Sequence, residues 1–180
     1  MRSMARTRRW WRECCGVLPQ SFATPLASCG LRLPPSSHPG PKEMSDLDLA
    51  LSIRQPWSEL ILQGRKTIEV RTWDTNHRGP IWLHTGKFAD PDLDRSLGVS
   101  NLPRGAFVGR IILTSISPID AGRWEHWRSQ HLDLGHYKPG MFAWILSSPE
   151  RLTGPVPAPG KLGLFEVDNA LARRLRAALR

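Results

Sequence analysis

Short stretches in which hydrophobic and polar residues alternate recur along the chain after residue 47, as in a protein built mainly of β-strands. Leu49, Leu51 and Ile53 alternate with smaller or polar residues, the period of a strand with one buried face. Gly109 interrupts a long apolar strand, which indicates a bulge or a close backbone contact. Further strands are predicted over residues 67–73, 81–85, 106–116, 141–146 and 162–167. The strand over residues 141–146 is predicted to be buried on both faces because it is continuously apolar.

The helices that the same pattern predicts are short. Pro56 suits the first turn of a helix that Gly64 ends. Asp90 and Asp120 are each placed to cap a further short helix, and the last helix covers residues 169–180. Strands predominate and do not alternate regularly with helices, so we predict an α+β, mostly β fold: a small barrel with short peripheral helices and a C-terminal helix.

Composition adds a bias in charge. The chain has 180 residues, enough for about one domain, and carries 25 Lys and Arg against 16 Asp and Glu, a formal net charge of +9. A basic surface favours acidic partners, nucleic acid first among them. No stretch approaches the ~18 uninterrupted apolar residues of a membrane-spanning helix, so we expect no membrane association.

More than half of that charge lies in residues 1–43, which hold seven basic and two acidic residues. The segment from Pro34 to Pro41 has no apolar periodicity, and all three cysteines of the chain lie before residue 30. We therefore predict a disordered, basic, proline-rich arm over residues 1–43 and a single domain over residues 44–180. The predicted domain has no cysteine, which excludes from it a disulfide scaffold and a Cys-ligated zinc site.

Three interpretations of the arm remain open. It is an organellar transit peptide, a flexible basic tail, or sequence upstream of a true start at Met44. A secretory signal is not indicated, because no apolar stretch of about 7–15 residues follows the arginines. We expect a cytoplasmic protein, or an organellar one if the arm is a transit peptide.

Three charged residues, Lys66, Glu69 and Arg71, lie within six positions of one another. Strand periodicity places Ile68 and Val70 toward the core and projects Glu69 and Arg71 together from the other face. Such a set forms either a surface ion-pair network or a pocket for a polar ligand.

The order of these residues is that of a known family. Gly64, Lys66, Glu69 and Arg71 form a Gly-x-Lys-x-x-Glu-x-Arg run, preceded by Gln-Pro-Trp at residues 55–57. Together with the later run at residues 77–84, these motifs closely resemble the ASCH domain, a member of the PUA-like group of β-barrels, over roughly residues 48–168.

The resemblance implies a barrel with a cleft that binds nucleic acid, RNA ahead of DNA, or a modified nucleoside. Lys66 and Arg71 would contact phosphate or a base edge, Glu69 would accept from an exocyclic amine, and Trp57 or Trp73 would stack on a base. The predicted ligand-binding residues are Arg54, Gln55, Trp57, Lys66, Glu69, Arg71, Trp73 and His84.

Each of these side chains also has a structural explanation. Trp57 and Trp73 can pack in the core, His84 can be a hydrogen-bonded barrel residue, and Arg54 can pair with a nearby acid. Three further tryptophans are assigned to packing: Trp124, Trp127 and Trp144. No metal site and no cofactor are predicted, since the histidines at positions 126, 131 and 136 recur at a spacing that matches no common metal motif.

The alternative function is hydrolysis. Some small ASCH proteins resemble amidohydrolases that act on N4-acetylcytidine through a Lys, a Thr and a Glu. The Lys falls on Lys66, but the Thr falls where this chain has Glu69. Lys66 and Glu69 would then be the catalytic acid/base pair. A third option, a protein-interaction adaptor, rests only on the arginine-rich last helix.

Overall fold

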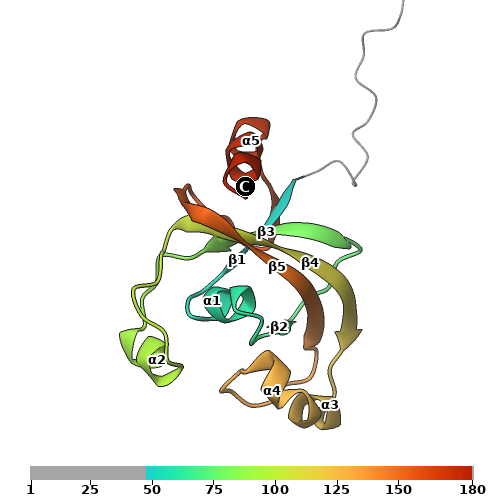
Figure 1. Cartoon of the computed structure of the whole chain (residues 1–180). Coiled ribbons are helices and arrows are strands. Elements are labelled where there is room, and N and C mark those ends of the chain that lie inside the picture. The colour runs from blue at the N-terminus through green and yellow to red at the C-terminus, as the bar shows by residue number, and fades with distance from the viewer. Residues whose placement is uncertain (1–47, 180) are drawn as a thin grey trace, which may run out of the picture. The chain divides into compact units, whose positions relative to one another are not determined.

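Residues 48–179 are described by a computed structural model, and the predicted arm over residues 1–43 lies outside them (Figure 1). Six strands form one mixed sheet in the order β2-β5-β4-β3-β1-β6, which curls into a half-barrel. The predicted α+β, mostly β fold is confirmed. The strands are β1 (Leu49–Ile53), β2 (Ile68–Arg71), β3 (Gly79–Thr85), β4 (Ala106–Pro118), β5 (Phe142–Pro157) and β6 (Leu164–Glu166).

Only the β1–β3 pair is parallel among these strands, and the other neighbours run antiparallel. The long strands β4 and β5 pair along most of their lengths and carry most of the curvature in Figure 1. Residues around Gly109 sit at a shift of this register. A side-chain carbon there would lie 2.5 Å from the Glu150 carbonyl oxygen, so the predicted close backbone contact is confirmed.

The short helices begin where acidic caps predict them. Asp90, Asp120 and Asp168 each accept a hydrogen bond from a backbone N–H of the following first turn. The helix expected after Asp120 is in fact two helices that meet at Trp127. The helices are α1 (Trp57–Leu62), α2 (Pro91–Ser96), α3 (Ala121–His126), α4 (Arg128–His131) and α5 (Asn169–Ala177).

Strand β5 differs from its prediction, because it continues through three prolines to Pro157 instead of ending at Leu146. Pro149 and Pro155 fall where the pairing with β4 shifts register, so the ladder does not need their missing N–H groups. Sequence periodicity cannot anticipate these shifts, since they depend on the partner strand.

Apolar side chains gather in three clusters. The largest fills the concave face of the sheet beneath α1 and includes Leu51, Ile53 and Trp144. The second lies on the opposite face of β1 and β3 and is covered by Leu175 of α5. The third packs under α3 and contains Trp124 and Ala143. The first part of β5 thus contributes Trp144 to one cluster and Ala143 to another on the opposite face, which confirms the predicted burial of residues 141–146 on both faces.

Candidate functional site

The three charged residues of the Gly-x-Lys-x-x-Glu-x-Arg run converge in the structure. The Glu69 carboxylate lies 3.4 Å from Lys66 Nζ and 3.2 Å from an Arg71 nitrogen. Lys66 Nζ also donates to the His131 carbonyl, and Arg71 donates to the Ser52 carbonyl at 3.1 Å. We refer to Lys66, Glu69 and Arg71 as the charged cluster.

Strand register explains which way the cluster faces. Glu69 is paired with Trp144 across β2 and β5, and directly paired residues of antiparallel strands share a face. Trp144 belongs to the concave cluster, so Glu69 points into the half-barrel. Ile68 and Val70 pack outward beneath α3. As predicted, Ile68 and Val70 face one side of β2 and Glu69 faces the other. Both faces of β2 are covered by other parts of the protein.

Burial decides how each charge can act. The side chain of Lys66 is 3% exposed, that of Glu69 is 11% and that of Arg71 is 23%. Arg71 is therefore the member of the cluster that solvent reaches most easily. Its Nε is buried and has no hydrogen-bond partner among residues 48–179. One carboxylate faces two cations, which leaves an excess positive charge at this site.

Two tryptophans adjoin the cluster. Lys66 Nζ lies 5.3 Å from the centre of the Trp57 ring, within cation–π range. Trp73 meets Trp144 edge to face at 4.6 Å, and its carbonyl accepts from the Trp144 indole. Both Trp57 and Trp73 pack against the concave cluster and remain partly exposed.

Local sequence sets the position of Lys66. Gly64 has a φ of +72°, which allows the chain to turn sharply after α1. The amide N–H groups of Arg65 and Lys66 then both donate to the Leu60 carbonyl. Lys66 also lines a cavity of about 260 Å³ together with Ser147 and other residues of β5.

Gln55 lies outside this cluster. Its side chain is fully buried, accepts from the Glu59 N–H at 3.1 Å and donates to the Pro103 carbonyl at 3.1 Å. Gln55 thus closes the first turn of α1 and ties it to the segment before β4. Its amide is occupied within the protein, which leaves it a positioning residue for α1.

Helix α1 is also fixed by an ion pair that sequence patterns do not reveal. Arg151 of β5 donates to both Glu59 carboxylate oxygens, at 2.7 and 2.9 Å. This contact with Arg151 holds the pKa of Glu59 below its usual value. The pair anchors the helix that precedes the charged cluster.

Arg54 and His84 also lie apart from the cluster. Arg54 is exposed and its guanidinium lies 5.2 Å from the centre of the Phe88 ring. His84 lies on the outer face of the sheet, where its ring is close to Phe107. Burial lowers the pKa of His84, which keeps the imidazole neutral near pH 7.

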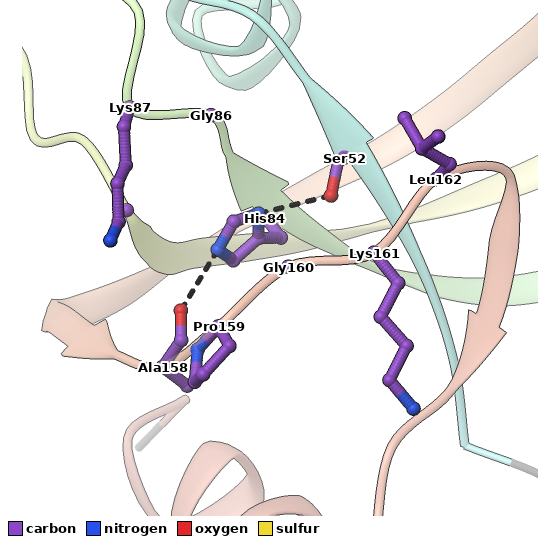
Figure 2. Close-up of a pocket in the computed structure, with 10 residues that line it drawn as sticks. Ser52, His84, Gly86, Lys87, Ala158, Pro159, Gly160, Lys161 and Leu162 are labelled. Carbon is purple, nitrogen blue, oxygen red and sulfur yellow. Dashed lines mark hydrogen bonds between the residues drawn. The ribbon is translucent and has the colours of Figure 1, made fainter.

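His84 forms one wall of a second cavity, of about 440 Å³ (Figure 2). Its two ring nitrogens lie 3.1 Å from Ser52 Oγ and 3.0 Å from the Ala158 carbonyl. We refer to this space as the outer cavity. It is lined by Ser52, His84, Gly86, Lys87, Gly105, Ala158, Pro159, Gly160, Lys161 and Leu162.

Sequence analysis does not single out Ser52, Lys87 or Lys161. The only signal in the sequence is a Gly-Lys pair that occurs at residues 86–87 and again at residues 160–161. More than seventy positions separate the two pairs, so only the folded chain brings them to one cavity.

The part of the chain that the structure describes holds no group of three His, Cys, Asp or Glu side chains able to bind a metal ion. None of its helices is long and apolar enough to cross a membrane.

Comparison with known proteins links the chain to one family. A family model described as the ASCH domain matches residues 51–155. Activating signal cointegrator 1 from Mus musculus is 26% identical over 94% of this chain, and its counterpart from Homo sapiens is 25% identical over 72%. The aligned regions cover 32% and 24% of those proteins, so this chain corresponds to about a third or less of each relative.

A crystal structure of ASCH from Zymomonas mobilis shares the fold. Its TM-score is 0.53 at 14% sequence identity, with 72% of this chain and 94% of the other covered. A serine-to-alanine mutant of that protein has a TM-score of 0.50 at 16% identity, again over 72% of this chain and 94% of the other. The likeness extends to the half-barrel itself.

Proposed function

The chain belongs to the ASCH domain family, and we propose that it binds single-stranded RNA on the concave face of its half-barrel. The observation that carries this proposal is the convergence of Lys66, Glu69 and Arg71 within ion-pair distance of one another. Placing three charges beside an apolar core is costly, and apolar side chains at the same positions of β2 would pack without that cost. A site for a charged, hydrogen-bonding ligand accounts for their presence.

Arg71 is the member best placed to meet RNA. It is the most exposed residue of the cluster, and its buried Nε–H has no partner in the described part of the chain. A phosphate oxygen or the acceptor edge of a base satisfies such a donor, and arginine is well suited to both. Glu69 would accept from an exocyclic amine, while Lys66 holds the Glu69 carboxylate in place.

Aromatic surfaces near the cluster suit unpaired bases. Trp57 and Trp73 are partly exposed beside it. A further aromatic surface lies apart from the cluster, where the Arg54 guanidinium is 5.2 Å from the centre of the Phe88 ring, which is 59% exposed. Stacking on such rings contributes about 1–3 kcal/mol per base and is tolerant of sequence. Single-stranded RNA offers bases free to stack, whereas a duplex does not.

Filter binding of the full chain to a single-stranded RNA across a salt series tests the proposal. Affinity should fall as salt rises, and Arg71→Ala should weaken binding and lower the slope of log K against log salt by about 0.7. Arg173→Ala is the matched control, because it removes one exposed arginine from α5. Weak binding that is insensitive to salt and equal in both variants would overturn the proposal.

The hydrolytic alternative requires Lys66 to exchange a proton with substrate. Lys66 Nζ lies within ion-pair distance of Glu69, at 3.4 Å, but its amine is also engaged by the His131 carbonyl and is almost fully buried. We therefore place hydrolysis second. Incubating the purified chain with N4-acetylcytidine discriminates, since release of cytidine that Lys66→Met abolishes would favour it over simple binding.

A further inference from the structure

The outer cavity carries positive charge that no group among the described residues neutralises. Lys87 and Lys161 line it, and none of its lining residues is acidic. Neither lysine forms an ion pair or a hydrogen bond within residues 48–179. Figure 2 shows the two side chains on opposite sides of His84: Lys87 comes from the segment after β3, and Lys161 comes from the segment before β6 and extends away from the imidazole.

This contrasts with most arginines of the domain. Among the described residues, Arg104, Arg110, Arg151 and Arg176 each pair with a carboxylate within 4 Å. Paired cations contribute little to attracting an anion, because their charge is already compensated. Lys87 and Lys161 therefore bring two uncompensated positive charges to opposite sides of one cavity.

The walls of the cavity are fixed by close packing. At Gly160 a side-chain carbon would lie 2.3 Å from the His84 ring and 2.7 Å from Ser52 Oγ, so the backbone here rests directly on these side chains. At Gly105, whose φ is +63°, a side-chain carbon would lie 3.2 Å from the stem of Lys87. The stem of Lys87 therefore runs along the backbone at Gly105.

His84 and Ser52 complete the wall without adding charge. The Ala158 carbonyl can only accept, so His84 Nε2 carries the ring proton and donates to it. Nδ1 of the neutral ring then accepts from the Ser52 hydroxyl. The cavity therefore attracts an anion through the two lysines and not through the imidazole.

Backbone donors lie in the same place. The N–H groups of Gly160, Lys161 and Leu162 make no hydrogen bond within the described residues, although the segment lines the cavity. Backbone N–H groups without internal partners remain able to donate to a bound anion. Two lysines and a run of such donors together suit a compact, doubly charged oxyanion.

We propose that the outer cavity binds a phosphomonoester, either the terminal phosphate of an RNA strand or the phosphate of a nucleoside monophosphate. A phosphomonoester carries about −1.5 to −2 charges at pH 7, which matches two lysines, whereas an internal phosphodiester carries only one. The volume of about 440 Å³ lies within the range of pockets that hold small ligands.

The RNA source of this phosphate rests on the proposed function, and Ser52 connects the two sites. Its carbonyl accepts from Arg71 of the charged cluster, while its side chain lines the outer cavity. The two sites are therefore separated only by β1. An RNA whose bases lie at the charged cluster would have to cross this one β-strand for its end to reach the outer cavity.

The first experiment uses the free nucleotide, so it does not depend on RNA binding. Adenosine monophosphate is titrated into the full chain and followed by amide chemical shifts, with adenosine in parallel. Shifts confined to the Gly86–Lys87 and Gly160–Leu162 segments, and seen only with the monophosphate, are expected. No shift at these segments up to millimolar nucleotide would overturn binding of the free nucleotide.

The second experiment compares RNA of one sequence with a 5′-phosphate, with a 3′-phosphate or with hydroxyl ends. One phosphorylated end should strengthen binding by about tenfold, as expected for charge-assisted contacts. The variant K87M/K161M should lose this gain and bind the hydroxyl-ended strand much as the unmodified chain does. Lys138→Met, which removes an exposed lysine from the segment before β5, should keep the gain.

The outcomes separate the two proposals. If Arg71→Ala weakens all three RNAs but keeps the gain from the terminal phosphate, both sites act as proposed. If RNA binds and no end phosphate matters, the outer cavity is not a site for RNA ends. If monophosphate binds at the two segments but no RNA binds, the cavity proposal holds and the proposed function fails.

Discussion

The charged cluster and the outer cavity lie on opposite sides of strand β1 and handle charge in opposite ways. In the cluster, Lys66 and Arg71 share the Glu69 carboxylate and lie largely out of solvent. In the outer cavity, Lys87 and Lys161 are exposed and have no carboxylate to meet. Buried charges need a counter-charge for the chain to fold, so the cluster keeps only one positive charge in excess, whereas both lysines of the outer cavity are uncompensated.

The contrast predicts its largest effect on stability in the cluster. Glu69→Gln keeps the size of the side chain but leaves the buried ammonium of Lys66 without a counter-charge. We expect a loss of about 3–5 kcal/mol in the free energy of unfolding, the usual result of breaking a buried ion pair from one side. Urea denaturation followed by tryptophan fluorescence measures it.

Glu150→Gln is the matched control, because Glu150 pairs with Arg110 at the surface. An exposed pair contributes only about 0–1 kcal/mol, so this variant should unfold nearly as the parent does. Equal unfolding midpoints for Glu69→Gln and Glu150→Gln would contradict the distinction between the two kinds of ion pair.

At the outer cavity, we expect a change of shape to lower the free energy of unfolding more than a change of charge does. Gly160→Ala places a methyl group where the His84 ring and Ser52 Oγ already lie. We expect a loss of about 1–3 kcal/mol, typical of overpacking, as the segment after β5 is pushed away. At Gly154 a side-chain carbon would meet nothing within 4 Å, so Gly154→Ala should lower the free energy of unfolding far less. Thermal unfolding of both variants measures the difference.

Each region also contains a buried histidine whose pKa is lowered chiefly by burial: His131 beside the cluster and His84 in the cavity wall. Near pH 6.5 and below, the unfolded chain takes up protons that the folded chain resists. The free energy of unfolding should therefore be constant above about pH 7 and decrease as the pH falls toward 5.5.

The variants His84→Gln and His131→Gln should each remove part of this pH dependence. His131 also faces Lys66 and Arg128, which lower its pKa further, and Asp133, which raises it. Melting temperatures recorded from pH 8 to pH 5.5 would show the effect. A stability that rises as the pH falls through this range would be incompatible with two neutral buried imidazoles.

The smallest effect on stability belongs to the two cavity lysines. Since Lys87 and Lys161 have no partner within the described residues, K87M/K161M should change the free energy of unfolding by no more than about 0.5 kcal/mol. The same urea series used for Glu69→Gln checks this. A loss of several kcal/mol would mean that these charges support the fold and are not held ready for an anion.

Much of the fold follows from local pattern. The apolar alternation of β1, the aspartate caps at residues 90 and 120 and the tight contact at Gly109 all follow from residues close in sequence. The extension of β5 through Pro149 and Pro155 does not, because it depends on how β4 shifts against it. The local propensity of a segment carries no information about pairing with a strand that is forty positions away.

The candidate site was likewise predictable from the sequence only in part. The sequence by itself placed Lys66, Glu69 and Arg71 together, because six consecutive positions after a helix-ending glycine cannot scatter far. Tertiary structure alone decided that Gln55 is occupied in positioning α1, that Lys66 is buried, and that His84 faces a different cavity. Tertiary structure also brought together two Gly-Lys pairs that are more than seventy positions apart in the sequence. The curvature of the sheet decides which loops meet, and this curvature depends on contacts between distant strands and not on local interactions.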